Sequence, residues 1–114
     1  MMFQKRVTLK YRIVYHLGIM IVSMIQLIFE IPDLQSIKEK RRIIRSLKDK
    51  LQRRFRMSAA EVDLQDSLSF AQIGGALVSN SRSFGESIMQ KALEMIERDL
   101  PVRIQDVHIY SEEF

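Results

Sequence analysis

The sequence of 114 residues contains no cysteine, which excludes disulfide bonds, zinc sites built on thiolates and thiol catalysis. Histidine is scarce as well, with only His16 and His108. There are four glycines and two prolines, and there is no low-complexity tract or fixed-period repeat. These absences indicate an ordinary globular chain, and the lack of cysteine fits an intracellular, cytoplasmic address.

The sequence also lacks a hydrophobic run long enough to cross a membrane. Its most apolar stretch, LGIMIVSMIQLIF, covers thirteen residues (17–29), whereas a membrane-spanning helix needs about 20. The following EIPDLQ offers no small-residue cleavage site of the kind that ends a signal peptide. We therefore interpret this stretch as a buried strand that ends before Pro32, and we expect no membrane partner.

The chain length leaves room for a single hydrophobic core. We expect one domain over residues 20–111, followed by a short tail, 112–114. Residues 1–19 form an N-terminal extension in which apolar and polar residues alternate between Val7 and Leu17. This alternation is typical of an added strand, although a disordered stretch and an upstream start are equally compatible with it.

Positive charge is abundant in one place. The stretch SIKEKRRIIRSLKDKLQRRFR (36–56) holds ten Lys and Arg against Glu39 and Asp49, a net charge of +8. The remainder of residues 20–114 carries −8, and residues 1–19 carry +4. The domain is therefore polarised, and a concentrated patch produces a stronger local field than the same charge spread evenly.

The basic stretch has the pattern of an amphipathic helix. Ser36 and Glu39 form a capping box, the arrangement in which hydroxyl and carboxylate satisfy free amides of the first turn. A predicted buried stripe follows at three-, four- and seven-residue steps: Ile37, Ile44, Leu47, Leu51 and Phe55. The opposite side of the helix is predicted to be basic.

Three further segments are predicted strands: 57–66, 70–80 and 102–110. Gly74-Gly75 indicates a bulge or a close backbone approach in the second of them. Residues 80–83 offer several N-caps for a second helix, of which Ser83 with Glu86 makes a capping box, and Pro101 is predicted to stop this helix. The order βαββαβ predicts an α+β, ferredoxin-like fold: an antiparallel sheet with two helices on one face.

Catalytic signals are weak. No nucleophile has an evident neighbouring base, and Gly74-Gly75 lacks the spacing of a phosphate-binding loop, so we expect no cofactor. A cluster of Glu61, Asp63 and Asp66, joined across the sheet by Asp106 and His108, is one hypothesis for a hard-metal site. An ordinary solvated sheet face explains the same residues. The sequence predicts a protein that is not an enzyme, with metal-dependent activity left as an alternative.

RNA or the ribosome is the partner that the basic helix favours, because Lys and Arg neutralise phosphates. The residues predicted to contact phosphates are Lys38, Lys40, Arg41, Arg42, Arg45, Lys48, Arg53 and Arg56. Base stacking on the sheet is not expected, since the strand AQIGGALVSN lacks the aromatic residues of an RNA-recognition motif. The alternative is that the helix merely presents a solvated face.

The second functional alternative concerns the sheet face turned away from the helices. Val22, Met24 and Ile28 alternate there with Gln26 and Glu30, which is more apolar than a freely wetted face requires. A second copy of the chain or the N-terminal segment would cover such a face. The protein would then be a homodimeric ligand-binding or regulatory module.

Several short segments follow one another in a distinctive order: IP (31–32), SIKEKR (36–41), SLK (46–48), AEVDLQD (60–66) and VSN (78–80). Together they resemble the YlxP-like family of small bacterial proteins of unknown function. The resemblance spans residues 20–111, and family members commonly begin near Met20. It implies a ferredoxin-like fold and no catalytic residues. Family genes tend to lie beside those of ribosome-maturation and initiation factors, which implies a role near ribosomal RNA. Ser81 and Ile37 depart from the family's usual Asp and Leu.

Overall fold

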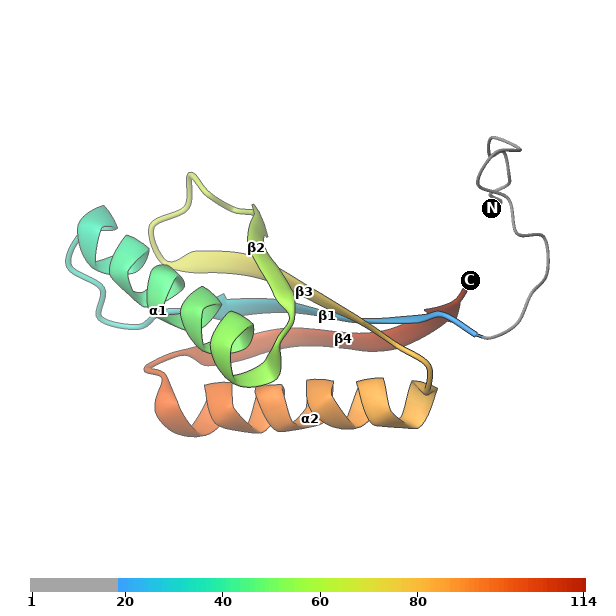
Figure 1. Ribbon diagram of the computed structural model, residues 1–114. Helices are drawn as coiled ribbons and strands as arrows, with labels where there is room; N and C mark the ends of the chain where they lie inside the picture. Colours follow the sequence, from blue (N-terminus) through green and yellow to red (C-terminus); the bar gives the residue numbers. More distant parts are fainter. Residues whose placement is uncertain (1–18) are drawn as a thin grey trace.

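The computed structural model describes residues 19–114 and contains six elements. In chain order they are β1 (Ile21–Glu30), α1 (Ile37–Phe55), β2 (Ser58–Asp63), β3 (Phe70–Ser79), α2 (Arg82–Asp99) and β4 (Arg103–Glu113). The strands form one antiparallel sheet in the order β2-β3-β1-β4, and both helices pack on the same face of it (Figure 1). The predicted ferredoxin-like fold is thereby confirmed. Most of the predicted N-terminal extension, residues 1–18, lies outside the described residues.

The central strand β1 separates a buried face of the sheet from an open one. Its odd-numbered residues from Ile21 to Phe29, together with Ile31, are at most 3% exposed. The even-numbered residues from Val22 to Glu30 are half-buried or exposed and lie on the other face. Alternate residues of β1 therefore face the core and the open side of the sheet, as the alternating pattern of a strand predicts. Because both helices cover the buried side, the other side remains an open face within residues 19–114.

The first helix begins as predicted but buries a different set of residues. Ser36 Oγ accepts a hydrogen bond from the amide of Glu39 at 3.1 Å, and the Glu39 carboxylate accepts from the amide of Gln35. The prediction that Ile37 belongs to the buried stripe is wrong, since it is 38% exposed. Lys40 lies in the stripe instead, four residues before Ile44.

Two other boundaries differ from the prediction. Helix α2 starts at Arg82, and Ser81 is its N-cap, with Oγ accepting from the amide of Phe84 at 3.1 Å. A capping box at Ser83 is therefore wrong, because this residue already lies within the first turn. At the other end of the chain, β4 continues to Glu113, so the sheet includes two residues that were assigned to the tail.

Gly74-Gly75 marks a close approach, not a bulge. The pairing of β3 with β1 runs without interruption through both glycines. A Cβ at position 75 would lie 2.6 Å from Sδ of Met57 and 3.3 Å from Cγ2 of Ile25. The absence of a side chain therefore lets the end of α1 and the start of β2 pack closely on the sheet.

Helix α1 ends in a strained conformation. Arg56 has φ 57° and ψ 33°, in the left-handed region, and its amide bonds to the carbonyl of Leu51. Glycine adopts this conformation without a Cβ penalty.

We expect Arg56→Gly to raise the free energy of unfolding by about 0.5–1 kcal/mol. The exposed Gln52→Gly, inside the helix, is the control and should lower it by about 1 kcal/mol. Urea unfolding measures both, and a destabilised Arg56→Gly would contradict this explanation.

No helix within residues 19–114 is both long and apolar enough to cross a membrane.

Candidate functional site

The outer side of α1 presents most of the predicted phosphate-binding residues to solvent. The exposed ones are Lys38, Arg41, Arg42, Arg45, Arg53 and Arg56, and Lys48 is half-buried. They share one helix because its apolar stripe faces the sheet and the remaining positions turn outward. The structure thus gathers seven of the eight predicted residues on or beside one surface.

Acidic neighbours neutralise part of this positive charge. Arg53 Nε lies 2.8 Å from Asp49 Oδ1, one turn earlier on the same helix. Arg54 Nη1 lies 3.6 Å from Asp99 at the end of α2. The hydrogen bond from Arg98, helped by the charges of Arg98 and Arg54, lowers the pKa of Asp99 below its ordinary value. Asp99 therefore stays ionised beside the last turn of α1.

Six of the predicted cations have no such partner within residues 19–114, and four of the six surround two hollows. One hollow of about 170 Å³ is lined by Arg41, Ile44, Arg45, Lys48 and Glu61. The other, of about 330 Å³, is lined by Arg42, Arg45, Ser46 and Asp49. Within residues 19–114, none of the four cations has a carboxylate oxygen within 4.0 Å. We call Arg41, Arg42, Arg45 and Lys48 the basic surface.

Arg45 is the centre of this surface because it borders both hollows. Arg41 and Lys48 approach the strand β2, whereas Arg42 lies on the opposite flank of the helix, next to Asp49. Anionic groups entering the two hollows would both lie against the Arg45 guanidinium, whose planar donor set suits phosphate oxygens. The arrangement has the chemistry of an extended anion-binding surface.

Lys40 is not part of this surface, and its prediction as a phosphate ligand is wrong. Its side chain is 2% exposed. Nζ donates hydrogen bonds to the carbonyl oxygens of Leu64 (2.9 Å) and Ser67, and it lies 3.8 Å from Glu61 Oε2. Lys40 therefore holds the turn between β2 and β3 against α1. Its place four residues before Ile44 is the one sequence signal for its burial.

The hypothesised metal cluster does not assemble. Glu61 and Asp63 lie on β2, whereas Asp106 and His108 lie on β4, and these strands are opposite edges of the sheet. The carboxylate of Glu61 faces the ammonium of Lys40 instead. In the part of the chain that the structure describes, no three His, Asp or Glu residues gather as metal ligands would.

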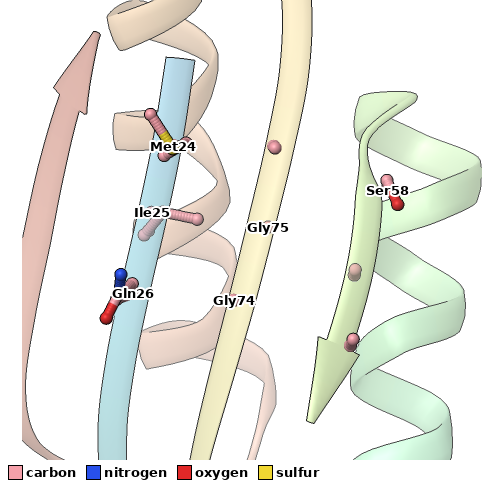
Figure 2. A pocket seen from close by; sticks show the side chains of 9 residues that line it. Met24, Ile25, Gln26, Ser58, Gly74 and Gly75 are labelled. Atoms are coloured by element: carbon pink, nitrogen blue, oxygen red, sulfur yellow. The ribbon is translucent and has the colours of Figure 1, made fainter. Parts of the chain in front are cut away.

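The open face of the sheet contains a hollow that the sequence did not indicate. Its volume is about 260 Å³, and it arises where short residues of β2 and β3 adjoin: Ser58, Ala60, Gly74 and Ala76. Figure 2 shows the bare backbone of Gly74 and Gly75 between Met24 and Gln26 on one side and Ser58 on the other, with the helices behind the sheet. This hollow suits an apolar group.

Comparison with known proteins confirms the resemblance to the YlxP-like family. The chain is 34% identical over 65 residues to the uncharacterized protein YlxP of Bacillus subtilis (strain 168), an alignment that covers 57% of this chain and 71% of the relative. Residues 22–109, nearly the whole described domain, match the family described as protein of unknown function (DUF503). The chain belongs to this family.

Proposed function

We propose that this protein is a non-catalytic RNA-binding protein that contacts RNA phosphates through the basic surface of α1. The observation that supports the proposal most strongly is the set of four cations around two hollows, each free of a carboxylate partner in residues 19–114. An unneutralised row of this kind supplies affinity for a polyanion through the release of counterions.

The proposed contacts are with the RNA backbone. In an RNA-recognition motif, aromatic residues on the two central strands stack on bases. Here the outward positions in the middle of β3 are Gln72, Gly74 and Ala76, and those of β1 include Met24 and Gln26. None of these side chains is an aromatic ring. Binding through phosphates on α1 therefore leaves the open face free for another role.

The test is fluorescence anisotropy with a labelled single-stranded RNA over a range of salt concentrations. Four phosphate contacts, one for each cation of the basic surface, predict a slope of about −3 in a plot of log K against log salt. A slope near zero, or no binding at low salt, would refute the proposal. Ribosomal RNA fragments are the first sequences to test, and crosslinking in cells followed by sequencing would identify the bound RNA.

Charge reversal at the centre of the basic surface should weaken binding most. We expect Arg45→Glu to lower RNA affinity by about tenfold at moderate salt, because it removes one contact and adds repulsion in both hollows. Lys91→Glu is the matched control, since Lys91 is exposed on α2 and the charge change is the same. Equal loss in the two variants would mean that only net charge matters and would contradict a site on α1.

A further inference from the structure

The open face of the sheet has two halves of complementary shape. Around Gly74, β2 and β3 form the hollow of about 260 Å³. On the other side of β1, β4 carries the exposed rings of His108 and Tyr110, whose centroids lie 5.8 Å apart. Both features are at the same level, because Gln26 of β1 pairs with Gly74 on one side and with His108 on the other.

The same face is nearly free of unpaired charge at its centre. Among the outward positions of β1 and β3 only Glu30 is charged, and it pairs with Arg103 at 3.0 Å. The other charges on this face of β4, Asp106 and Glu112, lie on the edge strand. Apolar side chains of this face are open to solvent, including Val78 of β3 at 64% exposure and Val62 of the edge strand β2 at 50%. Depletion of charge with exposed apolar side chains is typical of the centre of a protein interface.

We infer that a second copy of this chain covers the open face. The two copies are related by a twofold axis that runs parallel to β1 and lies between the two facing sheets. Rotation about this axis places β4 of each copy over β3 of the other. The rings of His108 and Tyr110 then enter the hollow beside Gly74 of the partner copy, and the contact is made twice. Such reciprocal contacts define an isologous dimer, and the two sheets pack with their strands roughly aligned.

The overlapping area is sufficient for a dimer. Three strands spaced about 4.8 Å apart, each ten residues long at about 3.3 Å per residue, give a flat footprint of about 500 Å² per copy. The total of about 1,000 Å² reaches the lower limit of specific interfaces. This total does not include the additional area of the protruding side chains. We therefore expect dissociation in the micromolar range.

The dimer does not depend on the proposed RNA binding. Helix α1 packs on the opposite face of the sheet, so the basic surface stays exposed in both copies (Figure 1). RNA binding and dimerisation can thus fail separately in experiments.

Sedimentation equilibrium of the full chain, between about 1 and about 100 µM, tests the association. We expect a reversible monomer–dimer equilibrium that Ala76→Arg weakens by about tenfold or more, because it places a long cation in the hollow. Gln90→Arg, on the exposed side of α2, is the control and should leave the equilibrium unchanged. Circular dichroism shows whether each variant is folded. A monomer throughout this range overturns the inference, whatever the variants do.

Crosslinking tests the position of the axis. The chain has no cysteine of its own, so Gln26→Cys introduces a single thiol close to the proposed axis. Because packed sheets lie about 10 Å apart, a bismaleimide of about that span should join two copies of this variant. Gln90→Cys on α2 should not be joined. A dimer that crosslinks only through position 90, or one that Ala76→Arg does not weaken, uses another surface and overturns the inference.

Discussion

Replacing Lys40 with methionine is expected to lower the free energy of unfolding by about 3 kcal/mol. Methionine keeps the packing of the aliphatic stem but removes the ammonium group, which donates to the carbonyls of Leu64 and Ser67 and faces the carboxylate of Glu61. Those oxygens then lose their charged partner in a site that is largely shielded from water. For a domain of this size, the loss corresponds to a fall of about 15 °C in the melting temperature.

Lys38→Met is the matched control, because Lys38 is exposed on the same helix. Thermal and urea unfolding should show a change of no more than about 0.5 kcal/mol for it. Adding Glu61→Gln to the Lys40→Met chain should cost little more, since the carboxylate has already lost its partner. If Lys40→Met costs less than about 1 kcal/mol, the buried ammonium is not what holds the turn between β2 and β3.

The second large effect is expected at Gly85, where α2 touches the sheet. A Cβ at this position would lie 2.8 Å from Cβ of Ser23 and would overlap the Ser23 hydroxyl. Ser23 is fully buried, and its Oγ is 2.8 Å from Ser111 Oγ, so moving the hydroxyl aside would break this hydrogen bond. We expect Gly85→Ala to destabilise the protein by about 2 kcal/mol, even though alanine favours a helix by about 1 kcal/mol.

A change at the opposing residue separates this steric effect from helix propensity. Ser23→Gly removes both atoms that the new methyl group would meet. In that chain, Gly85→Ala should become neutral or stabilising by up to about 1 kcal/mol. Unfolding in urea measures the four chains of this cycle. If Gly85→Ala costs the same with and without Ser23, contact between α2 and β1 is not the cause.

The alternation along the strands was predictable, because period two depends only on which residues are apolar. The start of α1 was predictable for a similar reason, since Ser36 and Glu39 act within one turn. The burial of Lys40 was not. Its partners, Leu64 and Ser67, come from a turn far along the chain, and a lysine is placed in solvent by default.

The start of α2 and the hollow on the open face were also not predictable from local sequence. Residues 80–83 offer several similar caps, and only the folded structure shows that Ser81 is the one whose Oγ accepts from the amide of Phe84. Gly74 alone predicts a close approach. The hollow also needs Ser58 and Ala60 beside it, and this depends on how β2 pairs with β3.

Local sequence patterns determined the order of the elements, the ferredoxin-like fold and the concentration of positive charge on one helix. Those properties follow from periodicity, capping and composition within short segments. Only the tertiary structure decided which cations remain free. Packing β2 and its turn against α1 removes Lys40 from the surface and leaves Arg41, Arg45 and Lys48 around a hollow. Side chains can be neutralised or buried only by neighbours that the fold brings near, so the number of available charges is a property of packing.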